Sequence, residues 1–380
     1  MNLTVADLSE SELLARIFPH LEPNEFVDLG PGDDCAVVTA PGGKFVVSTD
    51  VLVQDVHFKT QWSSGFEVGW RAAMQNLSDI GAMGAIPSTL VVGLAMPPAT
   101  EVAWMEDFAR GLAAASRQFG AAVVGGDLSS APALFISVTV HGHMPAGIPP
   151  VLRSGAKPGD VVAHCGLLGW SAAGLRSLLA ETGANPDASQ DNSGTENPDA
   201  PAPTNPARDA AGSQLDRRES ARQLFRTPLP PVSTGALAAR AGAHALMDVS
   251  DSLLRDAGRM GRASGVVLEL DAEAIAVHGD ALPQPYSGGR WLNKLGLPAV
   301  LGDLPAQSEA DAMALKLTGG EDHGLLATFS PDAELPAGFV AIGTVLEAVA
   351  DDERPHLRGG GVTVSGFDAG GLGEGWDHFR

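Results

Sequence analysis

Cysteine, basic residues and long apolar runs are all scarce in this chain of 380 residues. Its two cysteines, Cys35 and Cys165, provide no disulfide framework, so a reducing compartment such as the cytoplasm is expected. Lysine and arginine total 24 against 46 aspartates and glutamates, which gives a net charge of -22. This balance argues against nucleic acids and anionic membranes as partners, because both are bound through basic patches.

Segments that direct a protein into or across a membrane are also missing. No apolar run approaches the length of a membrane span, and the N-terminus has neither the basic nor the apolar region of a signal peptide. With 44% apolar and only 5% aromatic residues, the chain is expected to be globular with an aliphatic core. Its length is sufficient for two domains.

The usual phosphate-binding and kinase signatures are absent as well. The sequence contains no GxxxxGK[ST] loop and no HRD and DFG set. An enzyme of this composition that uses a nucleotide must therefore hold the phosphates in another way. Metal ions that bridge carboxylates to phosphate oxygens can do so, and in-line transfer to an acceptor phosphate then needs no covalent protein nucleophile.

What the sequence does contain is a recurring pattern of acidic residues beside glycine, serine or threonine. The pattern comprises Asp34, Asp50, Asp79, Asp127, Asp248, Asp251 and Glu321, most of them where a predicted strand ends. One such turn alone is equally consistent with a solvated loop, but the recurrence favours a shared site. Converging carboxylates repel one another by several kcal/mol unless cations lie between them, and their oxygens suit Mg²⁺ rather than zinc.

Periodicity and turn residues predict an α+β fold of two domains. Helices are expected over residues 7–18, 65–84, 100–119, 171–180, 232–241, 252–263 and 308–317. Strands are expected over residues 36–38, 45–47, 89–95, 121–124, 134–140, 161–165, 245–247, 266–270 and 325–329. Hairpin-like spacings favour this arrangement over a doubly wound sheet. A Gly- and Pro-rich stretch at residues 146–150 places the boundary between domains 1–150 and 151–380.

Two stretches of the second domain are expected to lack regular structure. Residues 183–222 are rich in Asn, Pro, Asp, Ser and Ala, and Leu215 is their only large aliphatic residue. Such a segment buries too little surface to offset its ordering entropy, so it is predicted to be a disordered surface insert. Residues 272–305, interrupted by Pro and Gly, are expected to be irregular.

Eight motifs in a fixed order carry a family resemblance from about Glu12 to the C-terminus. They are GDDCAVV, STDVLVQDVHF, NLSDIGAMGAIP, GGDLSSAP, RSGAKPGD, MDVSDSLLRD, GGEDHGLL and GWDHF. In this order they resemble thiamine-monophosphate kinases of the aminoimidazole-ribonucleotide-synthetase-like superfamily. The resemblance implies a transferase that uses ATP and Mg²⁺ to convert thiamine monophosphate to thiamine diphosphate. It also implies a cytoplasmic homodimer in which domain 1–150 binds ATP and Mg²⁺ and dimerises through its strands.

The same resemblance implies a role for each matching residue. The magnesium ligands it implies are Asp34, Ser48, Thr49, Asp50, Asp79, Asp127, Asp248 and Asp251. The nucleotide contacts are Gly126, Asp127, Arg153 and Ser250, and the thiamine-phosphate pocket contains His57, Glu321 and Trp376. Physically, an arginine clamps phosphate oxygens in a bidentate way, and a tryptophan stacks on a cationic or aromatic ring. Asp33 and Asp322 are expected to support turns rather than bind ligands.

Three positions depart from the family pattern. Ser252 stands where the family often has glycine, and His323 where it often has tyrosine. Ala109 aligns with a tyrosine that often lies near the adenine. These differences concern the pocket lining and the nucleotide contact, and none of them falls on an aligned metal acid.

Two alternative functions remain. Another ATP-dependent enzyme of the superfamily, such as a selenophosphate synthetase, usually carries a reactive cysteine in an N-terminal glycine-rich loop, which is not found here. A non-catalytic nucleotide- or metal-binding protein would not need the whole acidic set together with Arg153.

Overall fold

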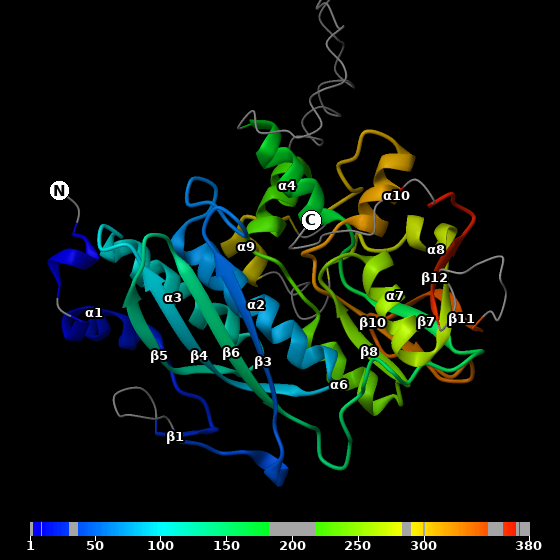
Figure 1. Cartoon of the computed structure of the whole chain (residues 1–380), viewed down its shortest axis with the longest axis horizontal. Coiled ribbons are helices and arrows are strands. Elements are labelled where there is room, and N and C mark those ends of the chain that lie inside the picture. The colour runs from blue at the N-terminus through cyan, green and yellow to red at the C-terminus, as the bar shows by residue number, and fades with distance from the viewer. Residues whose placement is uncertain are drawn as a thin grey trace, which may run out of the picture.

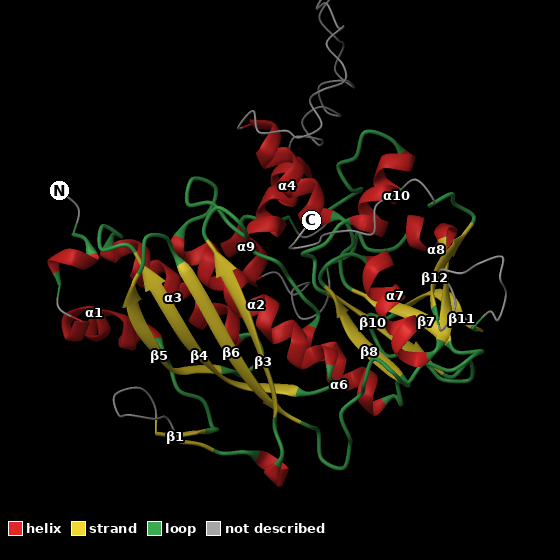
Figure 2. Ribbon diagram, in the orientation of Figure 1, coloured by secondary structure: helices red, strands yellow, loops and turns green. Residues whose placement is uncertain are grey.

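The computed structural model describes residues 3–8, 10–29, 37–181, 217–282, 290–298, 301–348, 360–369 and 372. Within these residues the chain forms a four-stranded sheet, a six-stranded sheet and a two-stranded ribbon. Figures 1 and 2 show the four-stranded sheet and its helices beside the six-stranded sheet, with helix α2 between them. The predicted α+β fold is confirmed.

The first half contains the four-stranded sheet and the two-stranded ribbon. Its helices are η1 (Val5–Asp7), α1 (Glu10–Ile17), η2 (Phe18–His20), η3 (Pro41–Gly43), α2 (Gly65–Ala82) and α3 (Val102–Arg117). Its strands are β1 (Val27–Leu29), β2 (Val37–Val38), β3 (Val46–Val53), β4 (Ile86–Met96), β5 (Ala122–Ser130) and β6 (Phe135–His143).

The second half contains the six-stranded sheet, in the order β12-β9-β11-β7-β10-β8. Its strands are β7 (Val161–Cys165), β8 (Ala245–Val249), β9 (Val266–Asp271), β10 (Gly324–Phe329), β11 (Val340–Glu347) and β12 (Gly361–Ser365). Its helices are α4 (Trp170–Glu181), a helix over residues 217–226, α6 (Val232–Arg240), α7 (Leu253–Ser264), α8 (Ala272–Ala276), α9 (Arg290–Leu295) and α10 (Glu309–Thr318).

The four-stranded sheet has the order β3-β6-β4-β5 and two unlike faces. One face packs on helices, and every second residue of β6 is buried there, as the 0% exposure of Ile136 and Val138 shows. The opposite face presents Val47, Val51 and Phe135, which are 56%, 37% and 42% exposed. A sheet face that keeps such apolar side chains exposed is a candidate contact surface.

Helix α2 lies at the centre of the molecule and is buried around most of its circumference. It begins with a capping box, in which Ser64 and Glu67 satisfy each other's backbone N–H groups. It packs on α3, β3 and β6 of the first half and on α6, β8 and β10 of the second (Figure 1). The contact with α3 requires Gly111, because a Cβ there would lie 1.9 Å from the Phe66 carbonyl oxygen. The helix therefore presents side chains to both halves.

The predicted helices agree with the structure to within three residues at each end. The predicted ends of the strands 45–47, 121–124 and 245–247 were wrong, because their ladders with β6, β4 and β10 continue through the residues that follow. Strand β3 includes Ser48–Asp50, strand β5 includes Gly125–Asp127 and strand β8 includes Asp248, so these acids lie inside strands. The region 272–305, expected to be irregular, contains the helices α8 and α9.

The expected insert at 183–222 falls largely outside the described residues, which resume at residue 217. Its last six residues are helical, and Ser220 and Ala221 are buried. The predicted disorder is therefore wrong for residues 217–222. None of the described helices has the length and apolar character needed to span a bilayer.

Candidate active site

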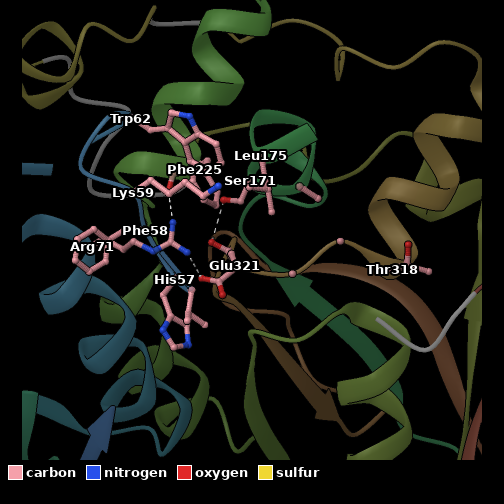
Figure 3. A pocket seen from close by; sticks show the side chains of 14 residues that line it. His57, Phe58, Lys59, Trp62, Arg71, Ser171, Leu175, Phe225, Thr318 and Glu321 are labelled. Atoms are coloured by element: carbon pink, nitrogen blue, oxygen red, sulfur yellow. Dashed lines mark hydrogen bonds and ion pairs between the residues drawn. The ribbon is translucent and has the colours of Figure 1, made fainter. Parts of the chain in front are cut away.

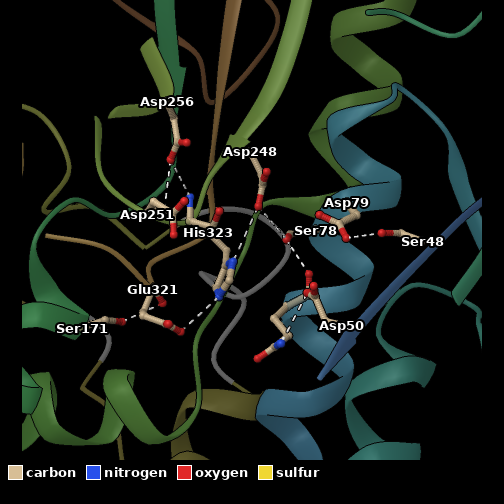
Figure 4. A network of polar contacts seen from close by, with 12 residues as sticks. Ser48, Asp50, Ser78, Asp79, Ser171, Asp248, Asp251, Asp256, Glu321 and His323 are labelled. Carbon is tan, nitrogen blue, oxygen red and sulfur yellow. Dashed lines mark hydrogen bonds and ion pairs between the residues drawn. The ribbon is translucent and has the colours of Figure 1, made fainter. Parts of the chain in front are cut away.

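Three carboxylates from three elements meet beside α2. They are Asp50 on β3, Asp79 on α2 and Asp248 on β8, and they are called the carboxylate cluster below (Figure 4). Ser48 Oγ, on the same face of β3 as Asp50, donates a hydrogen bond to Asp79 Oδ2 at 2.5 Å. Ser78 Oγ donates to Asp248 Oδ2 at 3.3 Å. Four predicted ligands, from three segments distant in sequence, are thus brought together.

Burial and then mutual repulsion disfavour the ionised carboxylates of the cluster. Burial, followed by the charges of Asp248 and Asp50, raises the pKa of Asp79 to about 7. Burial is also the main cause that raises the pKa of Asp50, which Asp248 raises further. A cation placed among the three carboxylates would relieve this repulsion.

Helix α2 also anchors the strand that carries Asp50. Gln75 Nε2 donates to Asp50 Oδ2 at 3.3 Å, and Asp50 N donates to Asn76 Oδ1 at 3.0 Å. Asn76 is fully buried, and its own amide donates to the Ala72 carbonyl at 2.8 Å. The helix thus fixes the position of the Asp50 backbone as well as supplying Asp79.

His323 is a buried imidazole between the carboxylate cluster and Glu321 (Figure 4). Its Nδ1 lies 3.7 Å from Asp248 Oδ2, and its Nε2 lies 3.7 Å from Glu321 Oε2. Burial alone would lower the pKa of His323, but Asp248 and Glu321 outweigh it and raise the pKa to about 10. The residue that replaces the usual tyrosine therefore connects the two parts of the site.

A cavity of about 300 Å³ opens on the other side of Glu321 (Figure 3). Its lining comprises Val56, His57, Phe58, Lys59, Trp62, Arg71, Ser171, Ala172, Leu175, Phe225, Thr318, Gly319, Gly320 and Glu321. Lys59 Nζ lies 4.7 Å from the Trp62 ring centroid, and His57 Nδ1 accepts a hydrogen bond from Val53 N at 2.9 Å. Mostly apolar walls with a few fixed polar groups are typical of sites for aromatic ligands.

Glu321 is held in the cavity wall by a strained turn. Its φ of 71° lies in the left-handed region, which a non-glycine residue adopts only when its surroundings enforce it. Glu321 N donates to the Ser250 carbonyl at 2.8 Å, and Ser171 Oγ donates to the Glu321 carbonyl at 2.9 Å. The neighbouring Asp322 accepts from Ser171 N at 2.8 Å at the start of α4, which is consistent with its expected supporting role.

The carboxylate of Glu321 is paired with a buried arginine. Arg71 Nη2 lies 2.6 Å from Glu321 Oε2. Burial would raise the pKa of Glu321, but Arg71 and then His323 outweigh it and lower the pKa to about 2. Glu321 is therefore an anion at neutral pH, fixed at the edge of the cavity.

Thr49 does not join the carboxylate cluster. Side chains alternate along a strand, so Thr49 points to the face of β3 opposite that of Ser48 and Asp50. Its Oγ1 donates to the Val138 carbonyl at 2.9 Å. The Thr49 side chain thus lies outside the cluster, and the magnesium role that the family resemblance implies for Thr49 stays a prediction.

Asp127 also lies on that opposite face, at the far edge of the sheet. It is in register with Val51 through β4 and β6, and residues in register share a face. Strands β3 and β5 are the two edges, separated by three strand spacings or about 14 Å. A single subunit therefore does not bring Asp127 to the carboxylate cluster.

Asp251 and Ser250 form the turn that supports Glu321. Asp251 Oδ2 lies 2.6 Å from Arg259 Nη1, so its charge already has a partner. Ser250 N donates to Asp256 Oδ2 at 3.1 Å. Ser252 caps α7 by accepting from Arg255 N at 3.0 Å, which accounts for serine in place of the usual glycine.

Arg153 and Gly126, two predicted nucleotide contacts, do not lie beside the carboxylate cluster in this subunit. Arg153 is exposed, and its carbonyl accepts from Ser264 Oγ at 3.0 Å at the C-terminal end of α7, whereas Ser250 and Asp251 precede the N-terminal end of that helix. Gly126 allows β5 to approach β4, because a Cβ there would lie 2.1 Å from the Val92 carbonyl oxygen. It also lines an apolar cavity of about 60 Å³ together with Ala109.

Two further predicted site residues, Asp34 and Trp376, lie outside the described residues.

Sequence reasoning missed the other polar residues of α2 and the wall supplied by Phe225. Arg71, Gln75, Ser78 and Asp79 have the spacing i, i+4, i+7 and i+8, which places them on one face of a helix. This polar stripe in a helix with many buried apolar residues was a signal that could have been used. Phe225 follows the long low-complexity segment, and no local pattern marks it.

The donor set of the cluster fits magnesium. All the groups are carboxylate or hydroxyl oxygens, as this hard cation prefers. Within the described residues, no three His, Cys, Asp or Glu side chains form a ready-made metal centre. An open set of carboxylates is what an ion shared with substrate phosphates requires, since Mg²⁺ in such sites keeps few protein ligands.

The fold and motifs agree with known proteins. A family model described as AIR synthase related protein, N-terminal domain, matches residues 32–144. A thiamine-monophosphate kinase from Mycobacterium tuberculosis is 38% identical over 91% of this chain and 88% of its own length. The crystal structure of thiamine-monophosphate kinase from Stenotrophomonas maltophilia covers 96% of this chain and 98% of its own, with a TM-score of 0.64 and 28% identity.

A further solved structure, AaThiL complexed with AMPPCP and TMP, covers 91% of each chain at a TM-score of 0.63 and 28% identity. The agreement of sequence and fold extends over nearly the whole length of these proteins, beyond the domain that the family model matches. The family predicted from the order of the motifs is thereby confirmed. The chain belongs to the thiamine-monophosphate kinase family.

Proposed function

We propose that this protein transfers the γ-phosphoryl group of ATP to the phosphate of thiamine monophosphate, forming thiamine diphosphate and ADP. One observation carries the proposal: the cavity at Glu321 and the carboxylate cluster adjoin through His323 along one face of α2. A substrate with aromatic rings at one end and a phosphate at the other fits this order. The family relationship supports it, as does the AaThiL complex with AMPPCP and TMP.

The reaction needs positioning more than it needs a reactive side chain. An oxygen of the acceptor phosphate forms a bond to the γ-phosphorus, and the bond from that phosphorus to the β–γ bridging oxygen breaks as ADP leaves. The acceptor phosphate is ionised near neutral pH, so no strong general base is required. Asp50, Asp79 and Asp248 would hold Mg²⁺, which when bound supplies positive charge to the phosphate oxygens. Glu321 and His57 orient the rings in the cavity.

The direct test is product formation. With ATP, Mg²⁺ and thiamine monophosphate, we expect ADP and thiamine diphosphate in equal amounts, measured by a coupled assay and by chromatography. Unphosphorylated thiamine lacks the attacking oxygen and is the matched control acceptor. ADP release without thiamine diphosphate, or equal ADP release with thiamine, would refute the proposal.

We also propose that two copies associate across the exposed face of the four-stranded sheet. Three apolar side chains are exposed there, and among the described residues no strand pairs with the outer edge of β3 or β5. A two-fold arrangement can place β5 of one copy beside β3 of the other. Asp127 would then reach the carboxylate cluster of the partner copy, which explains a predicted ligand that lies far from its own cluster.

In this arrangement residues 1–150 form the domain that binds ATP and Mg²⁺ and dimerises, and residues 151–380 complete the acceptor cavity. The boundary at residue 150 is part of the proposal. The cytoplasmic location expected from the cysteine content stays a prediction.

A further inference from the structure

Arg71, buried on α2, links this helix to two other parts of the cavity wall, Phe225 and Glu321. Its side chain is only 4% exposed, and its Nη2 lies 2.6 Å from Glu321 Oε2. Its Nη1 donates to the Phe225 carbonyl at 2.6 Å, and the guanidinium lies 4.4 Å from the Phe225 ring centroid. Figure 3 shows the guanidinium with its contacts to Phe225 and Glu321. A helix of the first half is thus bound to two separate segments of the second.

Both contacts to the Glu321 carboxylate use the same oxygen. Arg71 Nη2 and His323 Nε2 lie 2.6 Å and 3.7 Å from Oε2. Arg71 donates its hydrogen bond to Oε2, while the Glu321 side chain lines the cavity beside His57, whose charge also acts on it, and is 32% exposed. With Oε2 held by Arg71, the carboxylate has its second oxygen, Oε1, as the acceptor to offer a molecule in the cavity.

The position of Arg71 on α2 sets the distance between Glu321 and the carboxylate cluster. Asp79 lies eight residues further along the same helix face, about 12 Å away along the axis. Because one helix carries both residues, the separation between Glu321 and the carboxylate cluster is fixed. Arg71 itself contacts Glu321 and Phe225 but no member of the cluster.

We propose that Arg71 is a positioning residue for the acceptor: by holding Oε2 of Glu321, it presents Oε1 to a hydrogen-bond donor on the rings of thiamine monophosphate. This inference rests on the proposed function. A residue that acts in this way changes the affinity for the acceptor and leaves the affinity for ATP unchanged.

The test is the variant Arg71→Met, which keeps most of the length of the side chain and removes its charge and donors. We expect the KM for thiamine monophosphate to rise about 10- to 100-fold, as for a lost charge-assisted hydrogen bond, while the KM for ATP stays within about twofold. Arg71→Lys keeps the charge with one donor group and should give an intermediate KM. The dissociation constant of the acceptor, measured by isothermal titration calorimetry, should rise by the same factor.

A double-mutant cycle shows whether Arg71 acts through Glu321. In a Glu321→Gln background, Arg71→Met should add little to the KM of the acceptor. If the two effects are fully additive, or if Arg71→Met raises the KM values of both substrates alike, the proposal is overturned. Arg71→Lys is measured in the same cycle, so a poorly folded Arg71→Met protein does not leave the question untested.

Arg226→Met is the matched structural control. Arg226 Nε lies 3.1 Å from Glu67 Oε1, so it also joins α2 to the helix over residues 217–226, but it does not line the cavity. We expect an unchanged KM for thiamine monophosphate, and a rise equal to that of Arg71→Met would overturn the positioning role. A wild-type protein that makes no thiamine diphosphate refutes the proposed function; an active wild type with an unaffected Arg71→Met variant refutes this inference alone.

Discussion

Replacing Asp50 or Asp79 with asparagine is expected to lower kcat about 100- to 1000-fold while the fold survives. Each substitution keeps the size of the side chain but removes a formal charge from a ligand of a hard cation. Charge is redistributed over the phosphate oxygens during transfer, so the lost contact acts mainly on the transition state. The measurement is the rate of thiamine diphosphate formation at saturating ATP, acceptor and Mg²⁺.

Without Mg²⁺, the same two variants should melt at the wild-type temperature or above it. Burial and then repulsion raise the pKa of Asp79 from 3.8 to about 7, so its ionised form destabilises the folded state. This destabilisation is absent below the unfolded pKa of 3.8, grows as the pH rises from there to about 7 and is complete above it, so near neutral pH an asparagine removes it. Mg²⁺ with ATP should stabilise the wild type more than either variant.

Asp303→Asn is the matched control for both measurements, because the Asp303 side chain is 97% exposed and pairs only with Arg217 among the described residues. It should change neither kcat nor the effect of Mg²⁺ on melting. Near-normal turnover in both Asp50→Asn and Asp79→Asn would mean that phosphoryl transfer takes place elsewhere.

Mixing two inactive variants is expected to restore about a quarter of wild-type turnover. The two are Asp50→Asn and Asp127→Asn. If Asp127 acts at the cluster of the partner copy, a mixed dimer has one site with both changes and one native site. Random exchange makes half of the dimers mixed, so about one site in four is native. The measurement is turnover of the equimolar mixture after subunit exchange, compared with each variant alone.

The control mixture combines Asp50→Asn with Asp79→Asn, which lie in the same cluster of one subunit. Every site then keeps one change, and no turnover should return. A monomer mass in light scattering, or no recovery in the first mixture although exchange has occurred, would contradict the proposed dimer and the role of Asp127.

The carboxylate cluster was largely predictable because each of its acids stands in a short polar motif beside an apolar run. Asp50, Asp79, Asp248 and Glu321 carry such local signals, whereas His57 was assigned only through the family resemblance. Of the polar residues that α2 contributes to the site, Asp79 was predicted, but Arg71, Gln75 and Ser78 were not. A lone arginine such as Arg71 in a helix usually reaches solvent, and only the polar stripe along the helix distinguishes it.

The faces of the strands could not be predicted from sequence with the same success. Thr49 and Gly126 are of residue types that often follow a strand, yet pairing with neighbouring strands continues both strands past them. Once the strands are extended, alternation separates Thr49 and Asp127 from Asp50. The length of each strand depends on its pairing with neighbouring strands, and no local motif indicates that pairing.

A crystal structure with thiamine monophosphate, a non-hydrolysable ATP analogue and Mg²⁺ tests the central claim most directly. We predict that the rings occupy the cavity between Phe225 and Glu321, with a ring donor at Glu321 Oε1. The acceptor phosphate should lie at the Asp79 end of α2, among the carboxylates and in line with the γ-phosphate. Rings bound outside this cavity, or a phosphate turned away from the carboxylate cluster, would contradict the account.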